Sequence, residues 1–387
     1  MLPICCDVET TIFQNGNPYA QRNKLCYIGM YDGGESCLFR IEYSEQPYNE
    51  ALRHSTTIIN KYNLFVAFNA KFDIAWLRRY GIEIPKHMQV FDLQLVEFII
   101  TGQENPFPSL DDTCKRVGIA GKSGDIASRY WNQGIDTTEI PSNELEEYLQ
   151  QDLRAEWELF QWQLKYLEDK PQLKRLCWDA CQDFLVTQEM EHNGLFYDLE
   201  LSKQIGDAYN ERIKEIDLSL ASCVCQPVAN WNSGDWISCV LYGGTCQMDI
   251  TEEFEFEYKD GRTATKHRKA KLPITFPRLV EPLKGTELKK QGFFSTDEGT
   301  LRRLRCTGIS RKIVELMLER NKIEKKVGTY FHGIPKLYGE MDWTNSVIHG
   351  QLNHARAKTG RLSSSHPNQQ NLDPECRRCI KTRFLIS

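Results

Sequence analysis

Acidic residues at strand and helix spacings stand out in the first 152 positions of the chain. In LPICCDVETT, Asp7 and Glu9 are two apart in an apolar, β-prone run, so both carboxylates leave the same face of a strand. Asp73 closes the apolar run LFVAFNAKFD. Tyr148 and Asp152 are four apart in a helical pattern, ELEEYLQQDLRAEWELF, which places phenol and carboxylate on one helix face. These spacings allow one cluster.

Four carboxylates in one cluster need a counter-charge. Like charges repel one another and raise their own pKa values unless cations neutralise them. Oxygen-only ligands suit hard divalent ions such as Mg²⁺ or Mn²⁺. Two such ions about 4 Å apart stabilise the attacking and leaving oxygens of a phosphodiester. The sequence therefore predicts two divalent metal ions, Mg²⁺ or Mn²⁺, and hydrolysis of phosphodiester bonds.

The motif order DxE, NxxxD, YxxxD resembles the proofreading 3′–5′ exonuclease of phage-type family A (DNA polymerase I-like) DNA polymerases, in the subclass with Tyr in the third motif. The resemblance implies that Asp7 binds both metal ions and that Asp73 binds the second. It implies that Glu9 and Asp152 complete the site of the nucleophilic water. Tyr148 would orient that water, which makes all five residues catalytic.

Two further residues enter through the resemblance as DNA-binding candidates. Asn69 lies four before Asp73 and matches the family's Asn, and Thr10 stands where the backbone beside the DxE strand meets the terminal nucleotide. Each motif alone has an ordinary explanation, because DxE at a strand end is usually a solvated edge and Tyr148 alone would be a core aromatic. The assignment depends on all three motifs agreeing in order and context.

The N-terminal part, residues 1–168, alternates β-prone runs with helical patterns. Expected strands are Leu2–Cys6, LCYIGMYDGG and LFVAFN, and expected helices follow Asp73 up to Gly81, cover Leu93–Thr101 and begin near Asn143. The pattern alone predicts a mixed α/β domain. The resemblance implies a ribonuclease H-like exonuclease domain.

After residue 168 the pattern becomes mostly helical. Residues 169–350 resemble the N-terminal and thumb region of the polymerase, and 351–387 resemble the start of its palm. Near 252–280 the helical pattern is interrupted by EFEFEY, a KDG turn and RTATKHRKAK, which predicts an inserted β-hairpin with one acidic and one basic arm. The hairpin either contacts DNA or is held by charge pairs between its arms.

Positive charge is concentrated in the C-terminal part. Residues 262 to 387 contain 26 Lys and Arg against 11 Asp and Glu, although the whole chain has a net charge of −5. Such an excess favours contact with a phosphate backbone, and an ordinary solvated face is the alternative. Arg320, Lys322, Lys325 and Lys326 suit a helix that follows DNA, and Lys325 is the candidate contact.

The string HARAKTGRLSSSHPNQQNLD closely resembles the TGRLSSxxPNLQN segment that lines the primer-template duplex in family A polymerases. Its polar side chains suit phosphate, sugar and base-edge hydrogen bonds. Gln369 replaces the usual Leu. The DNA-binding candidates here are Arg361, Ser363, Asn368, Gln370 and Asn371.

The chain ends at Ser387, where the resemblance places the strand with the first polymerase aspartate. Nucleotidyl transfer needs two aspartates to hold its metal ions, so we expect the 387 residues not to polymerise alone. A split gene, a shortened product or a partial reading frame would each explain the end. We further expect a cytoplasmic protein, in the host cytoplasm if phage-encoded, because no apolar run is long enough for a membrane.

Three functions remain open. The first is a metal-dependent exonuclease for proofreading in DNA replication, which binds a single-stranded 3′ end and a primer-template duplex. The second is half of a split DNA polymerase, completed by a separately encoded palm and fingers chain. The third is a non-catalytic DNA-binding fragment. RNA-processing exonucleases share the acidic motifs, so DNA as the substrate depends on the C-terminal resemblance.

The lone C-x-x-C of Cys376 and Cys379 lacks a second pair for zinc.

Overall fold

The computed structural model describes residues 1–43, 48–120, 125–259 and 262–382. The chain forms two units, one of Met1–Leu199 with Ile334–Ser387 and one of Glu200–Gly333. This division groups residues that pack together. The domain boundaries at 168 and 350 were predicted from sequence motifs, and they remain a prediction.

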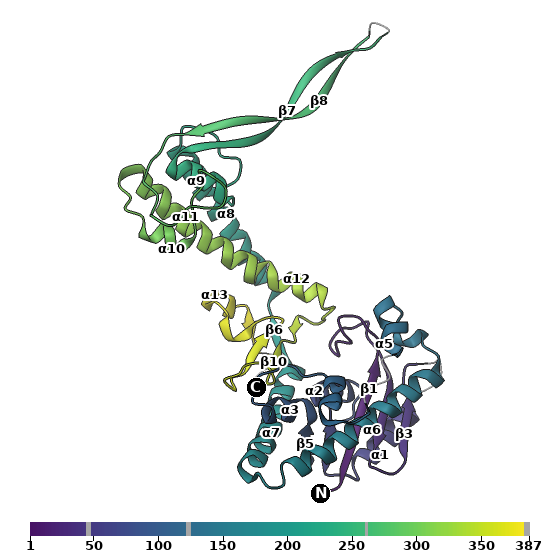
Figure 1. Ribbon diagram of the computed structural model, residues 1–387. Coiled ribbons are helices and arrows are strands. Elements are labelled where there is room, and N and C mark those ends of the chain that lie inside the picture. The colour runs from purple at the N-terminus through teal and green to yellow at the C-terminus, as the bar shows by residue number, and fades with distance from the viewer. Residues whose placement is uncertain (44–47, 121–124, 260–261, 383–387) are drawn as a thin grey trace. The chain divides into compact units, whose positions relative to one another are not determined.

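The first unit is built on a mixed five-stranded sheet with the order β3-β2-β1-β4-β5 (Figure 1). The neighbours β1, β2 and β3 pair antiparallel, whereas β4 and β5 join parallel to β1. Most of their side chains are buried, which explains the apolar runs in the sequence. The strands are β1 Pro3–Thr10, β2 Leu25–Tyr31, β3 Ser36–Arg40, β4 Leu64–Ala67 and β5 Gln89–Asp92. The predicted α/β domain is confirmed.

The first unit also contains helices, several of which pack on this sheet. They are α1 Asn49–Ile59, α2 Ala70–Arg79, α3 Leu93–Ile100, α4 Leu110–Val117, α5 Asp125–Arg129, α6 Ser142–Tyr166 and α7 Pro171–Asn193. The helix α6 packs on β1 and β2, and α7 packs on β5 and α3. Cys177, Cys181 and Phe184 of α7 are buried in the same core as the sheet. The helix α7, which begins at Pro171, therefore belongs to the first unit.

The turn between β4 and α2 differs from the expectation. The strand ends at Ala67, and α2 begins at Ala70, so Asp73 lies in the first turn of a helix. Asn69 adopts a left-handed conformation with φ of 70°, which Asn tolerates better than most residues. Asp92 accepts a hydrogen bond of 2.6 Å from the Ala70 N–H and so fixes the start of α2.

The C-terminal segment returns to the first unit through short strands. They are β6 Leu195–Tyr197, β9 Val347–Ile348 and β12 Ile380–Lys381 in one sheet, and β10 Gln351–Asn353 with β11 Ser363–Ser365 in another, followed by α13 Pro374–Arg377. Lys71 of α2 forms a buried ion pair of 3.0 Å with Glu191 of α7. Its ammonium also donates to the Leu352 carbonyl oxygen at 2.6 Å. This contact fixes β10 against α2 and α7.

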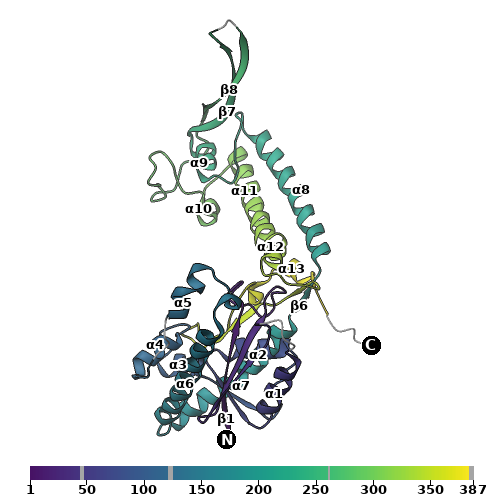
Figure 2. The same ribbon diagram turned by 90° about the vertical axis from the view of Figure 1, so that its right-hand side faces the viewer.

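The second unit is mostly helical, as predicted. Its elements are α8 Leu199–Cys223, α9 Gly234–Tyr242, β7 Gly244–Glu257, β8 Thr263–Phe276, α10 Glu298–Arg303, α11 Gly308–Lys326 and a π-helical turn, Val327–Phe331. The next helix, α12 Gly333–Glu340, belongs to the first unit from Ile334 onward. The helices α8 and α11 lie side by side (Figure 2). The strands β7 and β8 form the predicted hairpin and pair along their whole length. None of the helices in the described ranges has the length and apolar character needed to cross a bilayer.

Candidate metal centre

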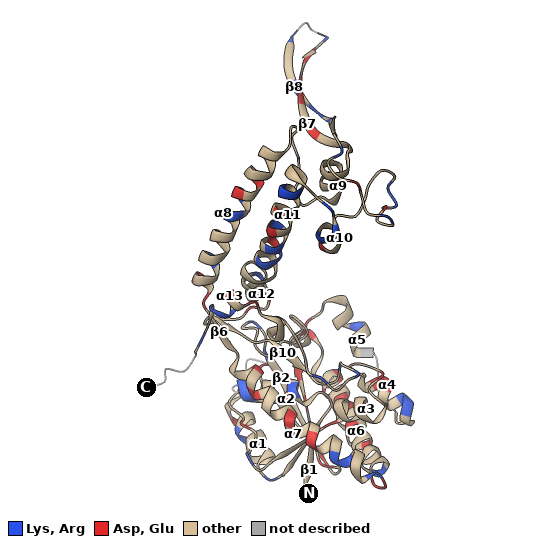
Figure 3. Ribbon diagram, turned by 90° about the vertical axis from the view of Figure 1, so that its left-hand side faces the viewer, with Lys and Arg blue, Asp and Glu red and all other residues tan. Residues whose placement is uncertain are grey.

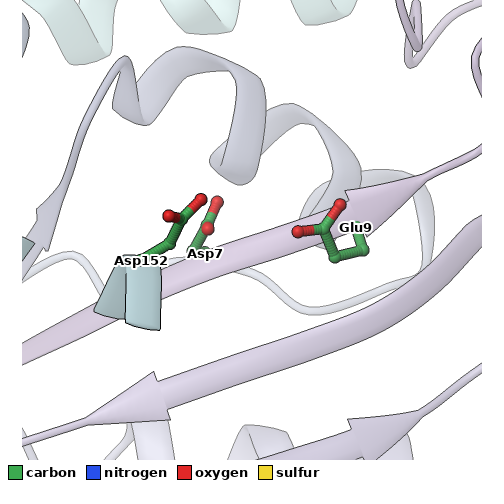
Figure 4. A group of neighbouring side chains, drawn as sticks. All are labelled: Asp7, Glu9 and Asp152. Atoms are coloured by element: carbon green, nitrogen blue, oxygen red, sulfur yellow. The ribbon is translucent and has the colours of Figure 1, made fainter. Parts of the chain in front are cut away.

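Three acids meet where β1 faces α6. Asp7 and Glu9 leave the same side of β1, and Asp152 reaches them from α6 (Figure 4). One ligand oxygen from each lies within 4.8 Å of the others. Glu9 and Asp152 are buried, and Asp7 is partly exposed. Three carboxylates at this distance can share a cation between them.

A glycine lets α6 approach the sheet at this point. Gly29 of β2 is the pairing partner of Asp7. A Cβ atom there would lie 2.8 Å from Leu153 Cδ1 and 2.9 Å from Leu149 Cγ, closer than packed carbon atoms approach. Both leucines are fully buried and lie on either side of Asp152 in the helix. The missing side chain therefore brings the Asp152 carboxylate to the sheet.

Asp73 lies beside this group and is attached to the same strand. Its Oδ1 accepts a hydrogen bond of 3.2 Å from the Val8 N–H, which is free for it because the pairing of β1 with β4 ends at Cys5. Burial, and then the charge of Asp7, raise the pKa of Asp73 well above its usual value. The structure thus brings all four predicted acids to one end of β1.

A fifth carboxylate, Glu156, belongs to the same neighbourhood and was missed in the sequence analysis. One of its oxygens accepts the Phe68 N–H at 3.1 Å, and its Oε2 is buried without a hydrogen-bond partner in the described structure. Burial, followed by the charges of Asp7, Asp73 and Asp152, raises the pKa of Glu156 well above its usual value. The signal was its position four residues after Asp152 on the same helix face.

The donor set fits a hard divalent cation. All the groups offer carboxylate oxygens, which Mg²⁺ and Mn²⁺ prefer. The raised pKa values of Asp73 and Glu156 come from burial and from neighbouring negative charge. Buried carboxylates without a counter-ion are unfavourable, and a divalent cation would supply the missing positive charge.

The other predicted residues of the nuclease site flank the acids. Tyr148 precedes Asp152 by one helical turn and is buried against Trp131, with edge-to-face rings 5.5 Å apart. Thr10 ends β1 directly after Glu9, and its carbonyl oxygen accepts the Thr137 hydroxyl at 2.6 Å. Asn69 is exposed at the start of α2, the helix of Asp73.

The predicted duplex contacts lie elsewhere in the chain. Lys325 is exposed on α11 of the second unit. The C-terminal candidates lie on or next to β11, with Ser363 half-buried and the others exposed: Arg361, Asn368, Gln370 and Asn371. None of them belongs to the group of Asp7, Glu9 and Asp152, which is the one acidic group of metal-binding spacing within the described ranges.

Arg320 was expected to face DNA, and that expectation is wrong. Its side chain is only 6% exposed and donates to Asp217 of α8 at 2.6 Å and to Glu324 at 3.1 Å. Along α11, Lys and Arg are interspersed with Glu (Figure 3). The packing of α8 against α11 therefore uses Arg320 for an internal ion pair, while Lys322 and Lys325 stay exposed.

Comparison with known families separates two parts of the chain. Residues 4–164 match the RNase H superfamily, in agreement with the sheet and helices that carry the acids. Residues 273–386 match DNA polymerase family A. The C-terminal part of the chain is therefore similar to the family A DNA polymerases. The family A match covers α11 and the TGRLSS segment.

Individual DNA polymerases resemble the chain over most of its length. It is 25% identical over 324 residues to DNA polymerase I of Synechocystis sp., which covers 82% of the chain and 28% of that protein. It is 22% identical over 371 residues to the DNA polymerase of Bacillus phage SP01, covering 91% of the chain and 39% of the phage protein. The chain thus spans less than half of the length of these relatives.

A solved structure shares the fold. The POL domain of Pol1 from M. smegmatis, in complex with DNA primer-template and dNTP, superposes with a TM-score of 0.60 at 16% sequence identity. The superposition covers 97% of this chain and 53% of the other. At this identity the likeness shows a common fold.

Proposed function

We propose that the chain is a metal-dependent 3′–5′ exonuclease, the proofreading part of a family A DNA polymerase. The observation that carries this proposal is the meeting of Asp7, Glu9 and Asp152 within 4.8 Å in an RNase H-like domain. The family A match over residues 273–386 supports DNA as the nucleic acid. A phage origin and a separately encoded palm and fingers chain stay predictions.

Each acid has a role that follows from its position. Asp7, Glu9 and Asp152 hold divalent cations, and Asp73 completes the ligand set while the Val8 N–H keeps its carboxylate in place. Such ions supply the charge that favours hydroxide formation and stabilises the leaving oxygen of a phosphodiester. Tyr148, one turn before Asp152, orients the attacking water through its hydroxyl group.

We propose that the terminal nucleotides of the strand occupy a cavity beside α2, the helix that carries Asp73. The cavity, of about 320 Å³, borders the start of α2, and its lining includes Asn69, Phe72, Gln94, Gln351 and Asn353. Amide groups can hydrogen-bond to sugars and base edges, and an aromatic ring can stack on a base. We assign this cavity and the Thr10 backbone to the unpaired 3′ end.

The decisive experiment follows a single-stranded DNA that carries fluorescein at its 5′ end. With Mg²⁺ or Mn²⁺ we expect a ladder of products shortened from the 3′ end, and with EDTA no product. Asp152→Asn should abolish the ladder. Glu158→Gln, an exposed acid on the same helix, is the matched control and should leave it unchanged. Absence of shortening over a wide range of enzyme and Mn²⁺ concentrations would refute the exonuclease.

The choice of DNA is tested separately, with an RNA strand of the same sequence. We expect the DNA strand to be shortened faster, because the C-terminal match is to a DNA polymerase family. Equal or faster cleavage of RNA would contradict DNA as the substrate but would leave the metal-dependent nuclease intact.

We assign the primer-template duplex to Lys325 and to the polar side chains of residues 361–371. Arg361 is exposed next to β11 and can contact a phosphate. Arg361→Ala should weaken binding of a hairpin DNA duplex. The slope of the logarithm of the binding constant against the logarithm of the salt concentration should become less steep by the amount of about one phosphate contact, and cleavage of single-stranded DNA should persist. The matched control is Arg175→Ala, an exposed arginine of α7. Equal duplex binding by the two variants would remove this segment from the duplex site.

A further inference from the structure

The hairpin β7–β8 has an anchored base and a solvent-exposed outer part. At its base Cys246, Ile274 and Phe276 are buried in the core of the second unit. Farther out, from Glu252 onward on β7, the side chains are exposed or half-exposed. There the ribbon of β7 and β8 extends away from α9 (Figure 1). An isolated two-stranded hairpin is at best marginally stable in water, and the side chains of the outer part are not buried. The stability of the second unit therefore does not explain why the hairpin extends this far.

The two faces of the outer part differ in chemistry. Directly opposed residues of an antiparallel pair share a face, and Phe254 pairs with Lys266. The ring face therefore contains three aromatic side chains, two cations and one acid: Phe254, Phe256, Tyr258, Lys266, Arg268 and Glu252. The opposite face is acidic along β7, with Asp249, Glu253, Glu255 and Glu257, and carries Lys269 and Lys271 on β8.

Cross-strand charge pairing explains only part of this pattern. Arg268 pairs with Glu252 at 2.9 Å. The exposed rings need no such pairing, yet Phe254, Phe256 and Tyr258 are 36%, 38% and 41% exposed. They occupy every second position of the strand, so all three point the same way. Exposed aromatic side chains in a row are typical of a binding surface.

We propose that the ring face binds single-stranded nucleic acid by stacking one base on each ring. Alternate residues of a strand are about 6.8 Å apart, which is about twice the 3.4 Å rise per nucleotide in one strand of a DNA duplex. Successive bases can meet Phe254, Phe256 and Tyr258 only when they are unstacked from one another. That spacing selects a single strand over a duplex.

The charges of the hairpin fit the same ligand. Lys266 Nζ lies 3.4 Å from the centroid of the Phe256 ring and 4.8 Å from that of Tyr258, where it occupies the place of a base. An exposed cation–π contact is weaker than a base stacked on an aromatic ring, so a base displaces the ammonium group toward the phosphates. Arg268 lies 5.7 Å from the centroid of Phe254 and pairs with Glu252, so it offsets the one acid of the ring face. The acids of the other face repel phosphate, so the strand lies on one side.

The test measures binding of fluorescein-labelled dT12 to the full chain by fluorescence anisotropy in EDTA, where the metal site is inactive. The triple variant Phe254→Leu, Phe256→Leu, Tyr258→Leu keeps apolar side chains but removes the rings. Its affinity should fall at least about 10-fold, since loss of one stacked base costs about 5-fold or more. The matched control Thr251→Ala, Thr265→Ala on the opposite face should bind like the wild type.

Cross-linking gives the position independently of affinity. A dT12 strand with one 5-iododeoxyuridine is irradiated on the wild-type chain, and the cross-linked peptides are identified by mass spectrometry. We expect cross-links within residues 254–258. Unchanged affinity of the triple variant, or cross-links confined to other segments, would overturn the proposal.

Two further outcomes separate this site from its alternatives. If the triple variant loses as much affinity for a dT12·dA12 duplex as for the single strand, selection of a single strand is wrong. If the leucine variant binds dT12 normally, the face is an apolar protein interface instead. The exonuclease proposal is tested apart from this one, because Asp152→Asn should leave binding to the ring face unchanged and the leucine variant should retain 3′ cleavage.

Discussion

The helix α6 and the strand β7 are both rich in acidic residues, yet they place their carboxylates in opposite environments. On α6, Asp152 and Glu156 are buried against the sheet. On β7, Glu253, Glu255 and Glu257 are exposed to water. Both segments have alternating or clustered acids in the sequence. The comparison teaches that burial, more than the number of acids, decides whether a carboxylate cluster needs a bound cation.

The cause of the difference is what each element packs against. Gly29 allows α6 to bring its acidic face onto β1, and loss of water then raises the pKa of Glu156. The outer part of β7 pairs with β8 and is exposed in the part of the chain that the structure describes, so its carboxylates stay hydrated and Glu252 contacts Arg268. An exposed ion pair of this kind contributes little to stability.

The largest contrast should appear in catalysis. Asp7→Ala should lower the rate of 3′ cleavage by at least about 1000-fold, because metal ions contribute several kcal/mol to stabilising the transition state. Glu255→Gln on the exposed strand should leave the rate unchanged. The measurement is single-turnover cleavage of labelled DNA with saturating Mg²⁺. A similar loss in both variants would mean that burial does not distinguish the two acidic segments.

The next effect concerns the packing that buries the acids. Gly29→Ala places a Cβ atom 2.8 Å from Leu153, so α6 must shift from β1. We expect the free energy of unfolding to fall by about 1–3 kcal/mol, together with weaker Mg²⁺ activation of cleavage. Gly81→Ala is unsuitable as a control because Gly81 has a positive φ, whereas Gly34→Ala meets no atom closer than 3.3 Å. Equal melting temperatures for the two variants would contradict the close approach of α6.

A smaller effect is expected from removing one buried charge. Burial raises the pKa of Glu156 in the folded chain, so the stability that its protonated form contributes is present below the unfolded pKa and is lost as pH rises through the folded pKa. Glu156→Gln should therefore raise the metal-free stability by about 1 kcal/mol at pH 8. The gain should shrink toward pH 5.

Melting temperatures in EDTA at both pH values measure this effect. The control is Glu158→Gln on the exposed side of α6, which should change neither value. A glutamine variant at position 156 that is less stable than the wild type at pH 8 would show that the Glu156 charge is compensated within the chain.

The smallest effect should come from the exposed hairpin pair. Glu252→Gln breaks the 2.9 Å contact with Arg268, and we expect a stability change below about 0.5 kcal/mol because water screens both groups. Chemical denaturation at low and high salt measures it. A loss above 2 kcal/mol would show that the hairpin depends on charge pairs after all.

Elements with a strong local pattern were predicted well. The apolar runs form the strands β1, β2 and β4, and the segment ELEEYLQQDLRAEWELF, whose apolar residues have helical spacing, forms part of α6. The position of Asp73 within a helix was not predicted. It depends on the left-handed Asn69 and on Asp92, which holds the Ala70 N–H from 22 positions along the chain. No local pattern contains that contact.

The roles of two charged side chains also could not be predicted from local sequence patterns. Arg320 and Glu156 both stand among acids and bases at helical spacing, which is typical of solvated helix faces. In the structure Arg320 pairs with Asp217 of another helix, and Glu156 lies next to the acids of β1. Each role is set by a neighbour from a distant segment.

The sequence by itself determined which acids share a face within one element, since backbone geometry fixes the direction of Asp7 relative to Glu9 and of Tyr148 relative to Asp152. Only the tertiary structure decided that β1 and α6 meet at Gly29, that Val8 holds Asp73, and that a fifth carboxylate joins them. The physical reason is that desolvation and charge repulsion depend on distances in space, and those distances are set by packing between elements far apart along the chain.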